Sequence, residues 1–491
     1  MSPHYYAACD LGAESCRVIL GILENDHLNI EEVYRFPNGP TLISDTLRSD
    51  IPRIFNELKI GLQKIAALGH QIESISTDSW GVDYVLTRNH EPLALPYHYR
   101  DARTDGAVEK ISAKVSADLI YSETGIQFVN VNTLYQLLDD LNHRPHLLGL
   151  SEQFLGIGDY VNYLLSGLSR AEESYASTTQ LFNPAKRKWS TQLIEKLHLP
   201  TEIFPQLVPS GTKLGPLLPT IANEIGLGGT QVVASCSHDT AAAVAAVPAD
   251  GEDWAYNSSG TWSLLGIETT EPILTAKSRE YNFTNEMGYG GTVRFLKNIV
   301  GLWLMQECRR EWAGEGEEYS YDQLMSLAEE AKPLKCLIYP NALRFWKTGN
   351  IPLKIVKYCR ETNQDTPKTH GEVIRCVLDS LALAYCQTLQ EITDVTGRKT
   401  ERLHIVGGGS RNRLLNQLTA NTTQLTVVAG PVEATAIGNI LVQAIALGHL
   451  DSLADLRRVV RNSFPVTYAQ PTDELAWQNA YERFRQLTLK S

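Results

Sequence analysis

The stretch YYAACDLGAESCRVILGIL, residues 5–23, decides the fold. It holds an apolar run over Tyr5–Cys9, a turn from Asp10 to Glu14, and a second apolar run over Val18–Leu23. Two short apolar runs on either side of a turn that contains glycine are typical of a β-hairpin. The sequence therefore predicts that the chain opens with two antiparallel strands, with Asp10 at the end of the first.

A third strand and a helix are predicted to follow this hairpin. The strand covers Leu28–Phe36. In the helix, apolar residues recur at three- and four-residue steps between Ile51 and Ile65, and Ser49 or Asp50 is the expected cap. A hairpin, an added strand and a helix that can cover the sheet are the start of an α/β layer structure.

The chain up to about residue 250 is less regular. A strand is predicted over Ile72–Thr77, and a long helical region is expected to fill the chain from there to about residue 200. Another short strand, Val232–Ser235, is followed by an alanine-rich helix over Thr240–Val247.

The opening pattern restarts near residue 254. Trp254–Asn257 is a predicted strand, Ser258–Gly260 a turn and Thr261–Ile267 a second strand. A third strand over Thr292–Leu296 leads into a helix over Ile299–Trp312. The hairpin, third strand and helix thus recur in the same order, so the chain duplicates its own architecture.

Strands and helices also alternate towards the C-terminus, which indicates α/β layers. These elements are the strand Leu403–Val406, the turn Gly407–Gly409, a helix over Asn412–Ala420, the strand Leu425–Ala429 and a helix over Glu433–Leu447 that ends at Gly448. We expect two similar domains, residues 1–248 and 249–491, which meet at the polar stretch 248–253. Two such domains would leave a cleft between them, and clefts between domains are common ligand sites.

Charge and composition exclude several classes of protein. The formal net charge of −12 opposes binding to nucleic acid and to anionic membrane surfaces. No apolar run approaches the roughly 18 to 20 residues of a membrane helix, so we expect a cytoplasmic protein. The eight cysteines show no zinc spacing, and free buried thiols are the expectation, although a disulfide between Cys359 and Cys376 stays open.

Three turns combine small residues with a place between strands or before a helix: Asp10–Arg17, Asn257–Trp262 and Gly407–Asn412. Small residues let backbone N–H groups point into a concavity, as in turns that cradle phosphate. Each turn alone is more often an ordinary tight turn. Three at matching places of a duplicated chain favour phosphate binding. Asp10 could hold a hydrated Mg²⁺ there, or could simply be a turn aspartate.

The stretch Ser237–Thr240 follows a strand and opens a helix. Asp239 could be a helix N-cap, or a general base that takes a proton from an attacking hydroxyl. His238 could contact a substrate or be a structural histidine. Asn298 could cap its helix or contact a ligand.

Aromatic and charged residues gather in two further stretches, Trp80–Asp83 and Tyr99–Arg103. Aromatic rings pack on the C–H face of a polyol, while carboxylate and guanidinium groups bind its hydroxyls. The alternative is a buried tryptophan beside a surface ion pair. Composition alone leaves both interpretations open.

In this order, the motifs resemble the FGGY carbohydrate kinase family, within the actin-like ATPase superfamily, over nearly the whole chain. The matching pieces are Asp10-Leu-Gly-Ala, Ser237-His-Asp-Thr, Ser259-Gly-Thr-Trp, the turn at Gly407 and Glu433-Ala-Thr-Ala-Ile-Gly. Closer cues are Asp78-Ser-Trp-Gly-Val-Asp-Tyr, Tyr99-Arg-Asp-Ala-Arg-Thr, Gly125-Ile-Gln-Phe, Asn132-Thr-Leu-Tyr-Gln-Leu, Leu296-Lys-Asn-Ile-Val-Gly-Leu-Trp and Ala429-Gly-Pro-Val-Glu-Ala. The resemblance implies two RNase H-like domains, the N-terminal one binding sugar and the C-terminal one nucleotide.

The same resemblance implies the reaction and the site residues. ATP with Mg²⁺ would phosphorylate the 1-hydroxyl of L-rhamnulose, with Asp239 as the proton acceptor. Asp10 remains the expected metal residue because of its place at the end of the first strand. The ketose would contact Gly81, His238, Asp239, Thr240 and Asn298. ATP would bind Ala13, Glu14, Ser15, Cys16, Arg17, Thr261, Gln306 and Gly408. Glu14 and Cys16 depart from the family pattern, in which this turn carries small or hydroxyl residues. The carboxylate of Glu14 would repel triphosphate unless it points to solvent or to the metal.

Two alternatives differ from this interpretation. One is a kinase for another ketose or polyol, such as L-fuculose, L-ribulose or xylulose, since the phosphate machinery is shared. The other is a non-enzymatic actin-like module that binds ATP. The presence of Asp239 and of the aromatic turn favours an enzyme, and the sequence does not indicate an oligomeric state.

Overall fold

The computed structural model describes residues 2–472 and 475–488, and the chain forms two compact units. The first unit contains the chain up to Pro248 together with Glu268–Leu296 and Glu433–Phe464. The second contains Ala249–Ile267, Lys297–Val432 and the chain from Pro465 onward. Neither unit is therefore a single continuous stretch of sequence.

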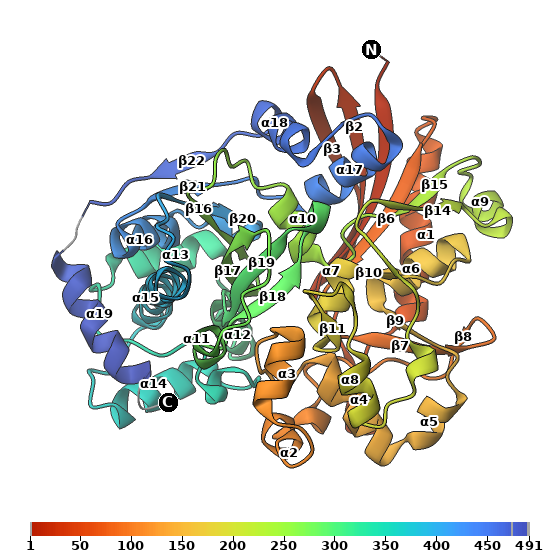
Figure 1. Ribbon diagram of the computed structural model, residues 1–491. Helices are drawn as coiled ribbons and strands as arrows, with labels where there is room; N and C mark the ends of the chain where they lie inside the picture. Colours follow the sequence, from red (N-terminus) through yellow and green to blue (C-terminus); the bar gives the residue numbers. More distant parts are fainter. Residues whose placement is uncertain (1, 473–474, 489–491) are drawn as a thin grey trace. The chain divides into compact units, whose positions relative to one another are not determined.

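The first unit is built on a six-stranded sheet in the order β14-β15-β6-β1-β2-β3 (Figure 1). Its strands are β1 (His4–Leu11), β2 (Ser15–Glu24), β3 (His27–Pro37), β6 (Ser74–Ser79), β14 (Thr212–Pro216) and β15 (Gln231–Ala234). The predicted hairpin is confirmed, because β1 pairs antiparallel with β2. On its other side β1 pairs parallel with β6, in a register that places Asp10 opposite Asp78.

Burial explains the order of the strands. Residues 6–11 of β1 are all buried, as expected for a central strand with neighbours on both sides and cover on both faces. Most of β3, at the edge, is partly or fully exposed. The predicted helix is α1 (Ile51–Ala67), and its cap is Asp50, whose Oδ1 accepts a hydrogen bond of 3.1 Å from the N–H of Arg53.

The predicted long helical region up to residue 200 is wrong. It contains a three-stranded sheet of β7 (Tyr84–Arg88), β8 (Glu91–Pro92) and β9 (Gln153–Gly156), with short helices around a separate apolar core. The longest of these helices are α4 (Thr133–His143) and α6 (Ile157–Ser166). Left-handed residues end several of them, such as Gly167 after α6, so no helix can run on through this region.

The second unit repeats the strand order of the first. In it, β16 (Trp254–Ser259) pairs antiparallel with β17 (Trp262–Thr269) and parallel with β20 (Arg402–Val406). The order β19-β17-β16-β20 matches β3-β2-β1-β6. β21 (Thr426–Ala429) and β22 (Thr467–Ala469) extend the sheet, and β19 covers Val293–Val300. The predicted duplication is confirmed.

Two details of the repeat differ from expectation. An extra strand, β18 (Thr284–Met287), pairs with the first half of β19. The next helix, α12 (Trp303–Gly314), begins four residues later than predicted. Asn298 therefore lies inside β19 and is not a helix cap, which corrects that interpretation.

The helices that follow agree with the sequence. In the second unit, α16 covers Arg413–Thr423. In the first unit, α17 (Ala434–Leu447) ends at the left-handed Gly448, as predicted, and packs on α10 (Asp239–Ala245). A Cβ at Gly438 would lie 1.8 Å from the carbonyl oxygen of Ala242, so this glycine permits the close contact. In the part of the chain described, no helix combines the length and the apolar character needed to cross a membrane.

All eight cysteines are buried and free, as expected, and this includes Cys359 and Cys376.

Candidate active site

Three carboxylates converge at one edge of the first unit's sheet. Asp10 in β1 and Asp78 in β6 are register partners at the ends of neighbouring parallel strands. Asp239 is the first residue of α10, and the preceding His238 forms a bridge with Ser79, the residue after Asp78. Asp10 and Asp78 are buried, whereas 31% of the Asp239 side chain is exposed, so only Asp239 is open to a substrate from solvent.

Burial and the charge of Asp10 raise the pKa of both Asp78 and Asp239. Burial raises the pKa of Asp78 well above its ordinary value, Asp10 and Asp239 add to this, and the hydrogen bond from Asn439 opposes it. Burial also raises the pKa of Asp239, with Asp10 adding and His238 opposing. Such mutual repulsion is relieved by a cation, so the cluster suits a positively charged ligand.

The oxygen atoms needed by a divalent cation are present in this cluster. Oδ2 of Asp78 accepts a 2.5 Å hydrogen bond from Asn439, while its Oδ1 is buried with no hydrogen-bond partner among the described residues. An orphaned buried carboxylate oxygen beside a second carboxylate is a donor set that hard divalent cations prefer. The residues at this edge therefore fit such an ion.

Arg17 connects Asp10 to the residue that precedes helix α17. Its guanidinium forms ion pairs with both Asp10 and Glu433, the residue that precedes α17. Burial alone would lower the pKa of Arg17, but the two carboxylates raise it above its ordinary value. A cation bound at Asp10 would have to share that carboxylate with Arg17 or displace it.

The first small-residue turn is tight and polar. The N–H of Gly12 donates to the carbonyl of Ser15 over 3.1 Å, and Ser15 already belongs to β2. The side chain of Cys16 is buried, and burial raises the pKa of its thiol. Glu14 is exposed, so its position satisfies the condition under which a carboxylate in this turn does not oppose phosphate.

His238 lies between the candidate base and a buried ion pair. Its Nε2 is 3.4 Å from Oδ1 of Asp239, and its Nδ1 is 3.3 Å from Oε2 of Glu286 and 3.1 Å from Nη2 of Arg294. Glu286 and Arg294 face each other across β18 and β19, at 3.0 Å. Burial would raise the pKa of Glu286, but Arg294 and His238 lower it below the ordinary value, so the carboxylate stays ionised.

Sequence reasoning missed Glu286 and Arg294. The only signal in the sequence was that one residue is acidic and the other basic. No strand was predicted around Glu286, because β18 is only four residues long. In the structure this pair fixes the ring of His238 and therefore the surroundings of Asp239.

Gly81 lies beside His238 in the turn between β6 and β7. A Cβ at Gly81 would be 3.3 Å from Nε2 of His238 and 3.2 Å from Oγ1 of Thr178, so a side chain would crowd the histidine. Thr240 follows Asp239, and its hydroxyl donates to Oδ1 of Asp239 over 3.1 Å. The structure thus brings together four predicted sugar-site residues of the first unit: Gly81, His238, Asp239 and Thr240.

Asp83 holds the aromatic turn in place. Its Oδ2 accepts hydrogen bonds from the indole Nε1 of Trp80 over 2.9 Å and from the N–H of Tyr99 over 3.1 Å. Burial raises the pKa of Asp83 to about 7, against the effect of these donors. Trp80 is 6% exposed, so its ring is mainly part of the core.

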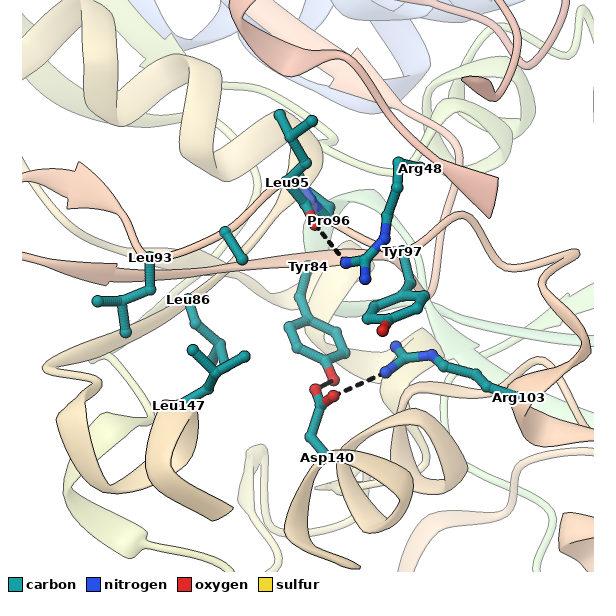
Figure 2. A pocket seen from close by; sticks show the side chains of 11 residues that line it. Arg48, Tyr84, Leu86, Leu93, Leu95, Pro96, Tyr97, Arg103, Asp140 and Leu147 are labelled. Atoms are coloured by element: carbon teal, nitrogen blue, oxygen red, sulfur yellow. Dashed lines mark hydrogen bonds and ion pairs between the residues drawn. The ribbon is translucent and has the colours of Figure 1, made fainter. Parts of the chain in front are cut away.

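Figure 2 shows a cavity beside this turn, where Arg48 and Arg103 lie over the ring of Tyr97. Nη1 of Arg103 is 2.8 Å from Oδ1 of Asp140, which also accepts a hydrogen bond from Tyr84 through its other oxygen. The cavity volume is about 30 Å³, room for about two water molecules, since one needs roughly 10 to 15 Å³ on this measure. It is too small for a ketose. Arg103 is paired with Asp140, and Nη1 of Arg48 donates to the carbonyl of Leu95 over 2.8 Å.

The remaining predicted residues belong to the second unit. The N–H groups of Leu302 and Gly301 donate to the carbonyls of Gly260 and Thr261 over 3.1 and 3.2 Å, which ties the β16–β17 turn to the start of α12. On that helix, Oε1 of Gln306 is buried and has no hydrogen-bond partner in the described part of the chain. An amide oxygen of this kind could accept a hydrogen bond from a ligand.

The second glycine turn of this unit packs against the end of β16. A Cβ at Gly409 would be 2.0 Å from Oγ of Ser259, and Gly407 has φ of +83° in the left-handed region, so both positions need glycine. A Cβ at Gly408 would meet no atom within 4 Å. Gly408 therefore presents its backbone to open space, as a phosphate-binding turn requires.

Two family models cover most of the chain. The N-terminal domain of the FGGY family of carbohydrate kinases matches residues 5–246, and the C-terminal domain of the same family matches residues 255–447. The chain belongs to the FGGY family of carbohydrate kinases.

Curated relatives are similar over their whole length. The chain is 40% identical to the rhamnulokinase of Bacteroides thetaiotaomicron over 481 residues, which is 98% of each chain. It is 42% identical to the rhamnulokinase of Enterococcus faecalis, over 98% of this chain and 97% of the relative, and 38% identical to that of Bacillus subtilis, over 99% of each.

Solved structures share the fold at lower identity. Gluconate kinase from Lactobacillus acidophilus superposes with a TM-score of 0.81 at 15% identity, covering 100% of this chain and 98% of that one. Xylulose kinase from Rhodospirillum rubrum gives 0.79 at 18% identity, covering 99% of each. The predicted two-domain α/β fold is confirmed, and it is consistent with the actin-like ATPase fold.

Proposed function

We propose that the chain transfers the γ-phosphoryl group of ATP to the 1-hydroxyl of L-rhamnulose, as part of L-rhamnose breakdown. FGGY sugar kinases use a sugar and ATP. The observation that carries the choice of sugar is the identity of 38 to 42% to rhamnulokinases over nearly the whole chain. The site in the first unit contains the groups that this reaction needs: the partly exposed carboxylate of Asp239 and the buried carboxylates of Asp10 and Asp78.

Asp239 is the proposed general base. Its carboxylate is the one of the three that is open to solvent, and its raised pKa makes its ionised form a better proton acceptor than an ordinary aspartate. As the sugar oxygen attacks phosphorus, the O–H proton passes to a carboxylate oxygen of Asp239. His238, held by Glu286 and Arg294, orients that carboxylate and the sugar.

Asp10 and Asp78 are the proposed ligands of Mg²⁺. The ion would neutralise charge on the phosphate oxygens of ATP when bound. The orphaned Oδ1 of Asp78 supports this assignment, and the ion pair with Arg17 would hold Asp10 in place.

The other site residues keep the roles that the family resemblance implies. Gly81, His238, Asp239, Thr240 and Asn298 contact the ketose in this proposal, and ATP binds the turn 13–17 together with Thr261, Gln306 and Gly408. Residues 1–248 would form the sugar-binding domain and residues 249–491 the nucleotide-binding domain. A cytoplasmic location stays a prediction.

The product identifies the sugar hydroxyl that reacts. L-Rhamnulose and ATP are incubated with the protein, and phosphorus–proton correlation spectroscopy is recorded on the product. The proposal predicts coupling of phosphorus to the protons of C1. A phosphate ester on any other carbon, or the absence of an ester when the sugar and ATP are both in excess, would overturn the regiochemistry.

A further inference from the structure

Three cysteines that play no part in the proposed reaction meet inside the second unit. Cys336 lies in the loop between α13 (Tyr321–Glu330) and α14 (Ile351–Glu361), Cys359 lies in α14, and Cys376 lies in the long helix α15 (His370–Thr396). Their Sγ atoms all lie within 4.8 Å of one another. Each residue is at most 2% exposed, and none forms a disulfide.

Buried free thiols are ordinarily packing residues, and Cys308 in α12 is an example of that kind. The group at Cys336 differs because three sulfurs from three separate segments point to one spot. Packing alone does not require three polarizable sulfurs to be mutual neighbours, whereas a thiophilic metal does.

The loop that carries Cys336 is fixed by polar contacts of the two residues that follow the cysteine. The backbone of Leu337 exchanges two hydrogen bonds with the amide of Gln364, of 2.9 and 2.8 Å. The N–H of Ile338 donates to Oγ of Ser380 over 2.9 Å, and that hydroxyl donates to the carbonyl of Cys376. The ligand atoms are therefore held in position by their surroundings, as supporting contacts hold the ligands of metal sites.

The loop is held before the cysteine as well. The N–H of Leu334 donates to Oδ2 of Asp379 over 2.6 Å, and Nζ of Lys335 is 2.6 Å from Oε1 of Glu372. Both acceptors belong to α15, the helix of Cys376. Because the lysine is partly exposed, the adjacent Cys336 is the edge of the cluster through which an ion could enter.

We propose that Cys336, Cys359 and Cys376 form a three-coordinate site for one Cu(I) ion. Thiolates are the ligands that Cu(I) prefers. In the described part of the chain, no fourth cysteine, histidine or carboxylate completes this group. Structural Zn²⁺ sites are almost always four-coordinate, so a closed group of three sulfurs favours the monovalent ion.

Binding forms three Cu–S bonds without a change of oxidation state. Each cysteine that is a thiol in the metal-free protein releases its proton to solvent when its sulfur becomes a ligand.

The test measures Cu(I) binding to the full-length reduced protein. Cu(I) is supplied from a solution buffered by a chromophoric Cu(I) chelator, and the chelator's absorbance reports transfer to the protein. The expected result is one tightly held Cu(I) per chain, with three sulfur neighbours in X-ray absorption spectra. Cys376→Ala should weaken binding at least about 100-fold, the scale on which metal sites respond to the loss of a supporting group.

Cys386→Ala is the matched control, since Cys386 is a buried free thiol on the same helix outside the cluster. It should bind Cu(I) like the wild type. Cys336→Ser, in the loop, provides a second variant if Cys376→Ala does not fold, and the sulfur count is measured on the wild type in any case. The proposal is overturned by absence of retained Cu(I), by a count of two sulfurs, by retention of Zn²⁺ alone, or by equal loss in Cys386→Ala.

Discussion

At the scale of single residues, the site depends on the contrast between one accessible carboxylate and two buried ones. Asp239 is partly exposed, while Asp10 and Asp78 are enclosed by β1, β6 and α17. Arg17 compensates Asp10, and Asn439 compensates Asp78. This leaves Asp239 as the carboxylate that can meet a sugar hydroxyl and take its proton.

Asp239→Asn should lower kcat by about 10² to 10⁴, the usual contribution of a general base. ATP should bind the variant as it binds the wild type, because the amide keeps the size of the side chain. Ketose-dependent ADP release measures the first effect and calorimetric titration the second. Asp451→Asn, at an exposed aspartate of the same unit, is the control and should be fully active. Near wild-type turnover in Asp239→Asn would remove the base assignment.

The pH profile should reflect the environment of Asp239. Burial and Asp10 raise its pKa above the ordinary 3.8. The base works only when ionised, so kcat/KM should fall as the pH is lowered through this raised pKa. The acid limb should therefore lie above that of an ordinary aspartate. An acid limb at or below pH 3.8 would contradict the assignment.

Asp78→Asn should raise the stability of the protein and lower its activity. A buried carboxyl with a raised pKa holds its proton more tightly in the folded than in the unfolded state, so its ionisation at higher pH weakens the folded state. At neutral pH the neutral amide should raise Tm, by about 2–4 °C for each kcal/mol gained. Loss of the charge should lower kcat about 100-fold.

Thermal unfolding at pH 7 and again at pH 4 separates these effects. The gain in Tm should shrink at the lower pH, where the wild-type carboxyl is protonated. A destabilised Asp78→Asn protein with unchanged kcat would show that Asp78 has a structural role only.

At the scale of elements, two glycines of the turn at Gly407–Gly409 have different requirements. Gly409 needs glycine because of Ser259, whereas Gly408 faces open space. Gly408→Ala should therefore leave the unfolding free energy within about 0.5 kcal/mol of the wild type. The added methyl group should weaken ATP binding about 10-fold by keeping phosphate from the backbone, and sugar binding should not change. Separate titrations of ATP and ketose check this, and an equal loss for both ligands would argue against it.

The sequence predicted the elements that have a clear period. Each of the hairpins β1–β2 and β16–β17 has two strands joined by a turn that contains glycine. Helix α1 has its apolar residues on one face. The region that begins with β7 was predicted wrongly because its strands have two to five residues, too short to show a period. The strand β18 was missed for the same reason, and with it the contact of Glu286 to His238.

At the scale of the whole molecule, the repeated strand order and the division of the chain into two units follow different boundaries. The hairpin, third strand and covering helix recur in both halves of the sequence. Even so, the segments 268–296 and 433–464 belong to the first unit, and they supply Glu286, Arg294, Glu433 and Asn439 around its carboxylates. Sequence order could not reveal these partners. They lie more than 150 residues beyond β3 in the sequence and reach the site only when the chain folds.

The family resemblance supplied what periodicity could not. It placed Asp239, His238, Thr240 and Gly81 in one sugar site, and the structure brings these four together. The hydroxyl pattern of the sugar is not visible in any of these contacts, so the choice of ketose depends on the curated relatives.

The most direct test of the account is ketose-dependent ADP release by the wild-type protein across a panel of L-rhamnulose, L-fuculose, L-ribulose and D-xylulose. The account predicts ADP release that requires a ketose, with the highest kcat/KM for L-rhamnulose. A higher kcat/KM for another ketose would contradict the proposed substrate, and ADP release that is the same with and without any ketose would contradict the assignment as a sugar kinase.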